Sequence, residues 1–272
     1  MTRRIFTIAL IALCGLLQAA PGQASTLYAV NFSGITPLYT IDQATGAASA
    51  VGGALTDIGD LTGDGASRLW GVSLNATNNL VRIDPLTGNA IGAVAITGTR
   101  AGQITSLAYD PVTGVLFGNT SPGFGDADGD DLYVIDPGTG VATFVGPIEF
   151  NDVFALGFDQ SGVLFGVADS TNELISIDTA TGLGTFVANM QVGSLFDIAS
   201  RPEDDVMFAV ESISQFTYTL DTSNGNLTGV GAWLGPTNLV GLAFASAPEP
   251  ATLALLGLAL AALGLGRRRA RR

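Results

Sequence analysis

Short apolar runs recur along the middle of this chain. From residue 25 to residue 247, runs of four to six apolar or alternating residues are separated by turns rich in Gly, Asp, Pro and Asn. Runs of this length between such turns are typical of β-strands. No stretch of this core sustains apolar spacings of three and four over ten residues, so the pattern predicts an all-β fold there.

The runs belong to a repeat of about 42 residues. One unit reads Leu-x-x-Ile-Asp-x-x-Thr-Gly at residues 38–46, 80–88, 132–140 and 174–182. A degenerate fifth copy lies at 220–225. Its aspartates are spaced by 42, 52, 42 and 43 residues, and an insertion around residues 121–130 explains the long interval. Four short runs per period predict a β-propeller of five four-stranded blades. The alternative, a β-solenoid, usually has much shorter coils.

The two ends of the core predict how the ring closes. Residues 27–30 (Leu-Tyr-Ala-Val) match the second strand of a blade that lacks its first strand, and residues 240–244 (Val-Gly-Leu-Ala-Phe) match a first strand without a partner. Pairing them would complete one mixed blade and remove an exposed sheet edge. No unpaired run remains to build a sixth blade.

The first 24 residues have the layout of a secretory signal peptide. Arg3 and Arg4 precede an apolar run of 13 residues, and small residues follow at positions 22 and 24. Cleavage between Ala24 and Ser25 is therefore expected. A membrane anchor, which is the alternative, needs about 20 apolar residues.

The C-terminal 25 residues combine three features. Pro248, Glu249 and Pro250 are followed by 16 apolar residues at 251–266, which predict a short apolar C-terminal helix. An arginine cluster that would hold the end of the chain on the cytoplasmic side of the inner membrane comes last, formed by Arg267, Arg268, Arg269, Arg271 and Arg272. The alternative is a plain C-terminal membrane anchor, which would need the apolar helix and the arginines but not the Pro-Glu-Pro sequence.

This order of features resembles the PEP-CTERM sorting tail of Gram-negative bacteria. The resemblance implies recognition and cleavage near residues 248–250 by an exosortase, after signal peptidase has acted. It also implies an exported protein that is held briefly at the inner membrane and then reaches the cell surface or the extracellular matrix. The core is similar to exported bacterial proteins with Leu-Tyr-x-Ile-Asp-x-x-Thr-Gly repeats, a likeness that names no activity.

Composition removes several kinds of chemistry. The chain has no His, all 11 basic residues are Arg, and its one cysteine lies in the signal peptide. Histidine-dependent nucleophilic catalysis, a lysine Schiff base and a disulfide in the mature protein are therefore excluded. Residues 25–247 carry 23 acidic residues and four arginines, a formal charge of −19. Such a surface should repel nucleic acids and anionic lipids.

Two sets of aspartates are candidates for function on the propeller. The repeated Asp42, Asp84, Asp136, Asp178 and Asp221 follow the third strand of each blade, where turn capping explains them better than catalysis. Asp60, Asp152 and Asp197 lie near the starts of predicted first strands, which line the channel. Three carboxylates at one channel mouth would suit a glycosidase-like or metal site.

The insertion offers a possible calcium site. Asp126, Asp128 and Asp130 alternate in a glycine-rich loop, and three carboxylates on a tight loop suit Ca²⁺. The spacing departs from an EF-hand loop, because Gly129 comes early and no distal Glu follows at the usual place. A solvated acidic loop is the alternative.

Taken together, the sequence predicts an exported, non-enzymatic propeller that acts as a binding or structural module, with exopolysaccharide or another envelope component as a partner. The rival hypothesis is a carboxylate-dependent glycoside hydrolase that acts on exported polysaccharide. First-strand carboxylates that face one another in the channel would favour the hydrolase, and an apolar channel would favour the module.

Overall fold

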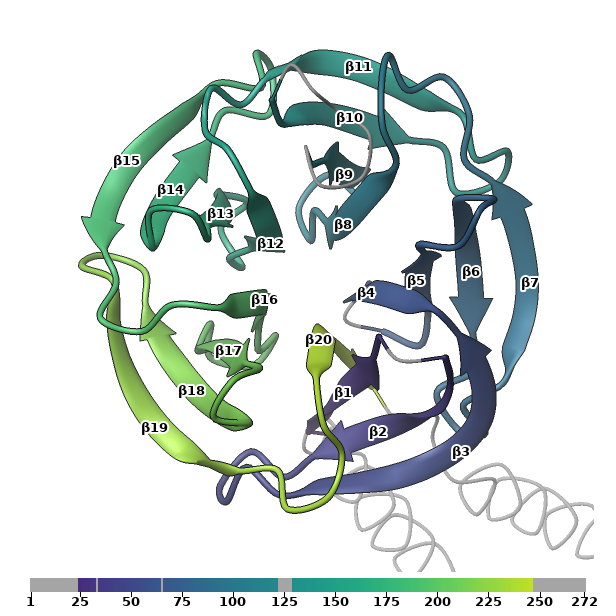
Figure 1. The fold of residues 1–272 in the computed structure, drawn as a ribbon, viewed down its shortest axis with the longest axis vertical. Coiled ribbons are helices and arrows are strands. Elements are labelled where there is room, and N and C mark those ends of the chain that lie inside the picture. Colours follow the sequence, from purple (N-terminus) through teal and green to yellow (C-terminus); the bar gives the residue numbers. More distant parts are fainter. Residues whose placement is uncertain (1–23, 33, 65, 122–128, 247–272) are drawn as a thin grey trace, which may run out of the picture. The chain divides into compact units, whose positions relative to one another are not determined.

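Five four-stranded antiparallel sheets are arranged in a ring, which confirms the predicted five-bladed β-propeller (Figure 1). The computed structural model describes residues 24–32, 34–64, 66–121 and 129–246. The strands belong to one compact unit, Ser25–Ala247. In each blade the first strand lies nearest the central axis and the fourth forms the outer rim (Figure 1).

The strand boundaries follow the sequence repeat. The blade that closes the ring consists of β20 (Leu239–Ser246), β1 (Ser25–Asn31), β2 (Ile35–Ile41) and β3 (Ala48–Thr56). The next two blades are β4 (Ile58–Gly63), β5 (Leu69–Ser73), β6 (Asn79–Ile83) and β7 (Ala90–Ala95), and then β8 (Ile104–Tyr109), β9 (Leu116–Thr120), β10 (Asp131–Ile135) and β11 (Ala142–Pro147). The last two are β12 (Val153–Phe158), β13 (Leu164–Ala168), β14 (Glu173–Ile177) and β15 (Gly184–Asn189), and then β16 (Leu195–Ser200), β17 (Met207–Glu211), β18 (Phe216–Asp221) and β19 (Asn226–Ala232).

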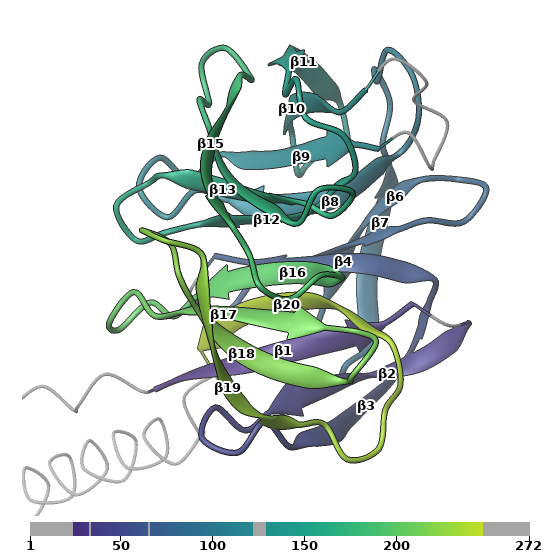
Figure 2. The same ribbon diagram turned by 60° about the vertical axis from the view of Figure 1, so that its left-hand side comes forward.

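The ring closes between the two ends of the propeller chain, as predicted. Strand β1 pairs antiparallel with β20, with Leu27 opposite Phe244 and Val30 opposite Gly241. On its other side β1 pairs with β2. The strand therefore lies between β20 and β2 in the closing blade (Figure 2). Its residues Leu27 and Val30 are completely buried.

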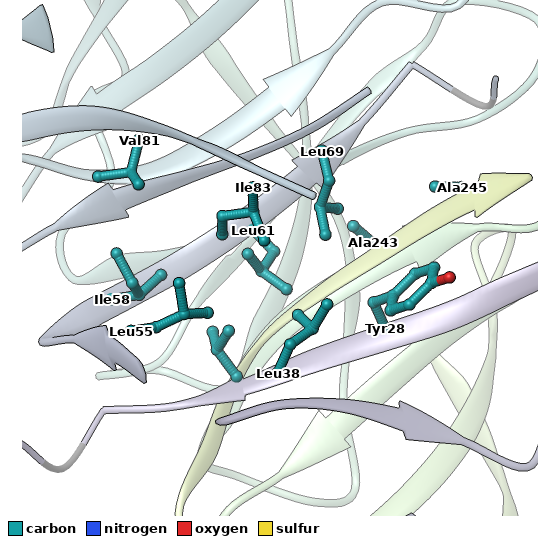
Figure 3. Packing of buried hydrophobic residues seen from close by; sticks show 11 residues of the cluster. Tyr28, Leu38, Leu55, Ile58, Leu61, Leu69, Val81, Ile83, Ala243 and Ala245 are labelled. Atoms are coloured by element: carbon teal, nitrogen blue, oxygen red, sulfur yellow. The ribbon is translucent and has the colours of Figure 1, made fainter. Parts of the chain in front are cut away.

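The hydrophobic core is divided among the interfaces between neighbouring blades. Five buried apolar clusters are present, one at each interface. Figure 3 shows the cluster between the closing blade and the β4–β7 blade, where Leu38 from β2 packs with Leu61 and Leu69 from β4 and β5. Because apolar side chains project from both faces of each blade, the second strands β5, β9, β13 and β17 are buried along their whole length. This explains the near-continuous apolar runs in the sequence.

The repeated aspartates cap turns, which confirms the structural interpretation of these residues. The carboxylate of Asp42 accepts hydrogen bonds from the backbone N–H groups of Ala44 and Thr45 at 3.0 and 2.8 Å, and from the Thr45 hydroxyl at 2.9 Å. These bonds stabilise the charged form and lower the pKa of Asp42. Equivalent side-chain-to-turn bonds occur at Asp84, Asp136, Asp178 and Asp221.

The glycine that ends each of these turns also brings two blades together. Gly46 has a φ of 74°, and a Cβ there would lie 2.3 Å from the carbonyl oxygen of Gly231 on β19 of the neighbouring blade. Gly88 has a φ of 69° and approaches the carbonyl oxygen of Gly52 in the same way. The Asp-x-x-Thr-Gly repeat thus encodes a turn and a close backbone contact between blades.

Within the residues that the structure describes, no helix is long and apolar enough to cross a membrane. The short apolar C-terminal helix predicted at residues 251–266 and residues 1–23 of the predicted signal peptide lie outside the described residues.

Candidate functional site

The third residues of the five inner strands form a ring of small and polar residues around the axis. The five positions, in ring order, are Gly241 on β20, Asp60 on β4, Ser106 on β8, Ala155 on β12 and Asp197 on β16. The two carboxyl groups belong to strands that are separated in the ring by β20. The propeller therefore brings together two acids that are 137 positions apart in the sequence.

Asp60 and Asp197 are buried, hydrogen-bonded to each other and saturated by backbone donors. The two oxygens of Asp60 accept the N–H of Leu61 at 2.8 Å and the N–H of Leu107 on β8 at 2.6 Å. Asp197 accepts the N–H of Ile198 at 2.7 Å and that of Leu242 on β20. Each acid thereby ties its own inner strand to the next one in the ring, and the side-chain contact between them spans the axis.

Both carboxyl groups of this pair have raised pKa values. Burial raises the pKa of Asp60 to about 8, against the opposing effect of its hydrogen bonds. Burial and the neighbouring Asp60 carboxyl raise the pKa of Asp197 well above its ordinary value. At neutral pH the pair therefore holds at least one proton, because two adjacent charges cannot both be supported without water.

Two polar side chains complete the ties between inner strands. The Ser106 hydroxyl donates to the carbonyl of Phe154 on β12 at 2.5 Å, and the Thr62 hydroxyl accepts the N–H of Tyr109 on β8 at 3.0 Å. Where the axial ring carries Gly241, a Cβ would lie 2.7–2.9 Å from the backbone of β4, so close packing replaces a polar tie. The sequence reasoning missed Ser106, although its alignment with Asp60 and Asp197 in the repeat was a usable signal.

The predicted trio of channel carboxylates is wrong for Asp152. This residue precedes β12, is half-buried and has a φ of 58°. Its carbonyl accepts the N–H of Asp169 at 2.9 Å, and its charge is one of the causes that raise the pKa of Asp169, after burial. Asp57 and Asn238 enter their inner strands in the same left-handed conformation, which Asp and Asn tolerate well. Asp152 is therefore a strand-entry residue that lies apart from the axial pair.

The carboxylates of Asp60 and Asp197 do face one another in the channel, which is the geometry that would favour a hydrolase. Their exposed fractions, however, are 1% and 0%, and all four oxygens have backbone donors. A substrate atom would have to displace these bonds to reach either carboxyl group. In the described conformation the pair holds the inner strands together.

A separate cavity of about 310 Å³ lies at the C-terminal ends of the inner strands. All five inner strands contribute to its wall, together with the turns that follow them. Three aromatic residues belong to its lining: Phe158 and Phe244, which are only 5% and 4% exposed, and Tyr109, which is partly exposed and stacks on Trp70 with the ring centroids 5.6 Å apart. The cavity therefore combines a central position with one accessible aromatic side chain.

Apart from Asp64, the polar side chains in the cavity wall are neutral. Thr62, Gln160 and Ser200 line the cavity, and Gln160 Nε2 donates to the Ser200 hydroxyl at 3.1 Å. Among the described residues of the lining, Asp64 is the only charged side chain, and it pairs with Arg68 Nε at 2.7 Å. The described lining thus offers hydrogen-bonding groups and the Tyr109 ring without a free cation.

The predicted calcium ligands are only partly described. Asp126 and Asp128 lie outside the described residues. Asp130 is buried, and its carboxylate accepts the N–H of Val153 at 2.5 Å, which ties the end of the insertion to β12. Within the described ranges, no group of three or more acidic or cysteine side chains is placed to hold a metal ion. The calcium site stays a prediction.

The fold and the sorting tail together define a class of protein: a five-bladed propeller with a C-terminal sorting signal. The PEP-CTERM protein-sorting motif matches residues 246–272 of the chain. This motif implies an exported protein that is processed by an exosortase and has a C-terminal membrane anchor. It covers only the tail and says nothing of what the propeller does.

Solved structures support the fold alone. The propeller is similar to a chain in the crystal structure of a nidogen/laminin complex, with a TM-score of 0.53 and 12% identity over 84% of this chain and 100% of that one. A protein of unknown function from Bacteroides thetaiotaomicron VPI-5482 is similar at a TM-score of 0.48, with 12% identity over 76% of this chain and 50% of that chain. Kuenenia stuttgartiensis hydrazine synthase is similar at 0.43, with 14% identity over 63% and 47%. No curated protein matches the sequence.

Proposed function

We propose that the protein is a non-enzymatic binding module of the cell envelope or extracellular matrix, whose ligand is a neutral polysaccharide. The cavity at the C-terminal ends of the inner strands carries this proposal. It has the concave shape, the mixture of apolar and polar groups and the size of a small-ligand site. The partly exposed Tyr109 ring and the neutral hydrogen-bonding groups fit a sugar ring, which presents one apolar face and several hydroxyl groups.

Charge supports a neutral ligand over an anionic one. The propeller segment carries a formal charge of −19, and the one acid in the cavity wall is already paired with an arginine. An anionic polymer would be repelled at a distance and would find no free cation in the cavity. A neutral polysaccharide avoids both costs.

Binding should therefore depend on the cavity wall. With neutral and anionic oligosaccharides as probes, we expect titration calorimetry to detect binding of neutral ones only. Tyr109→Ala and Gln160→Ala should each weaken it by about fivefold or more, since truncation of a central contact typically costs more than about 1 kcal/mol. Phe186→Ala, at a 48% exposed residue on the outer strand β15, is the matched control and should bind normally. Equal affinity in all variants would contradict the proposal.

The glycoside hydrolase is kept as a second candidate because Asp60 and Asp197 face each other in the channel. The same oligosaccharides serve as its test. Release of shorter sugars by the wild type, and its loss in a folded Asp60→Asn variant, would favour the hydrolase over the binding module. Intact sugars after prolonged incubation would favour the module.

We further propose that the processed protein ends at the cell surface or in the extracellular matrix. In a host with an exosortase, mass spectrometry of the mature protein should find no peptide from residues 253–266. Glu249→Gln, or deletion of the arginine cluster, should leave a longer, membrane-retained species, because the cluster resists passage through hydrocarbon. Glu149→Gln changes an exposed glutamate outside the tail, is the matched control and should be processed as the wild type is. Intact tail in the secreted wild type would point to an ordinary anchor.

A further inference from the structure

We propose that Glu203 is the docking site for the α-ammonium group that signal peptidase creates at Ser25, so that removal of the signal peptide locks the closing blade by a new ion pair. The inference rests on the expected cleavage between Ala24 and Ser25 and on the contacts around Ser25. It concerns the other end of the chain from the sorting tail and does not depend on the binding function.

Ser25 is held by one carboxylate through two donors. Its backbone N–H donates to Glu203 Oε1, and its hydroxyl donates to Glu203 Oε2 at 2.8 Å. Ser25 is the first residue of β1, lies opposite Ser246 of β20, and is only 4% exposed. Glu203 lies between β16 and β17 of the neighbouring blade. The contact therefore ties the ends of the propeller chain to the next blade.

A second set of contacts fixes the surroundings of Ser25 and leaves Glu203 available to it. Gln43 Nε2 donates to the Ser25 carbonyl at 2.8 Å, and Gln43 Oε1 accepts from Arg201 Nη1 at 2.8 Å. Arg201 in turn forms two bonds of 2.7 Å with Asp204. The guanidinium is thus paired with Asp204, and the carboxylate of Glu203 faces the backbone nitrogen of Ser25.

Cleavage changes the charge of that nitrogen. Water adds across the Ala24–Ser25 peptide bond, the carbonyl carbon of Ala24 becomes a carboxylate, and the nitrogen of Ser25 becomes an amine that takes up a proton at neutral pH. A neutral amide hydrogen bond is thereby replaced by a charge-assisted one of the same geometry, which is stronger. Burial raises the pKa of Glu203, but the Ser25 hydrogen bonds and the Arg201 charge outweigh it and lower the pKa overall, so the partner is ionised.

The composition of the chain allows a selective test. Because the chain has no Lys, the α-amine of the mature protein is its only primary amine, and an N-hydroxysuccinimide acetate modifies that group alone. We expect exported wild-type protein to begin at Ser25 and to react at least tenfold more slowly than Glu203→Gln. Acetylation should lower the melting temperature of the wild type by about 2–4 °C, the shift expected when one ion pair is lost from a domain of this size.

Two comparisons decide the outcome. Acetylation should leave the melting temperature of Glu203→Gln nearly unchanged, because its ion pair is already absent. Glu149→Gln, at an exposed glutamate between β11 and β12, should react and respond as the wild type does. An equal loss of stability on acetylation of the wild type and Glu203→Gln, or a mature chain that begins at another residue, would overturn the proposal.

Discussion

Deletion of residues 25–33 should abolish stable folding of the propeller. The deletion removes β1, which pairs with β20 on one side and with β2 on the other. Leu27, Ala29 and Val30 are completely buried, and Tyr28 is 3% exposed. Burial of a large apolar side chain contributes roughly 1.5–3 kcal/mol, so the loss approaches the 5–15 kcal/mol that stabilises a typical domain. The deletion also leaves β20 and β2 as open edges, which promote aggregation.

Point variants give a graded control for this experiment. Leu27→Ala, on β1, should destabilise the protein by about 2–5 kcal/mol, as truncation of a buried Leu usually does. Ile35→Ala, at a side chain that is 71% exposed at the start of β2, should change stability by less than about 0.5 kcal/mol. Thermal unfolding measures both. An unchanged melting temperature in the deletion would mean that the ring does not close through β1 and β20.

The second large effect is a pH dependence that comes from the axial pair. Burial raises the pKa of Asp60 to about 8 and the pKa of Asp197 well above its ordinary value, so the folded protein binds more protons than the unfolded chain over a window that begins at the ordinary value of 3.8 and, for Asp60, ends at about 8. The free energy of unfolding should therefore fall as pH rises through this window, by at most about 1.4 kcal/mol per pH unit for each proton. The contribution of Asp60 is complete below the ordinary value and is lost above about pH 8.

Other carboxylates limit this gain on the acid side. Hydrogen bonds in their turns lower the pKa values of Asp42, Asp136 and Asp221, and the stability that these groups contribute is lost as pH falls below about 3.8. Burial raises the pKa of the half-buried Asp169, which acts in the same direction as the axial pair. Maximum stability is therefore expected in mildly acidic solution, near pH 4–5.

Variants at the axis isolate the contribution of the pair. Asp197→Asn removes one titrating group and should flatten the stability profile between pH 5 and 8. Asp178→Asn, at an exposed turn aspartate, should keep the slope of the wild type. Chemical denaturation at a series of pH values gives the comparison. A wild-type profile that is flat or rises over this range would show that the pair does not retain a proton.

The sequence by itself determined the features that depend on local pattern. The 42-residue period, the short runs and the incomplete blades at residues 27–30 and 240–244 were sufficient for five blades and their closure, because each signal concerns neighbouring residues or a repeat count. The turn aspartates could be interpreted for the same reason, since the Asp42 carboxylate bonds only residues two and three positions ahead. The sorting tail is also a linear motif.

Only the tertiary structure decided which polar residues meet. Asp60, Asp152 and Asp197 all lie near strand starts, yet Asp60 and Asp197 are the third residues of β4 and β16. Asp152 precedes β12, whose third residue is Ala155. The propeller therefore brings Asp60 and Asp197 together at the axis and leaves Asp152 beside Asp169. The pairing of Ser25 with Glu203 likewise required the closed ring, because 178 positions separate the two residues and no repeat relates them. Distances across the axis depend on how the blades rotate and close, and no local pattern records them.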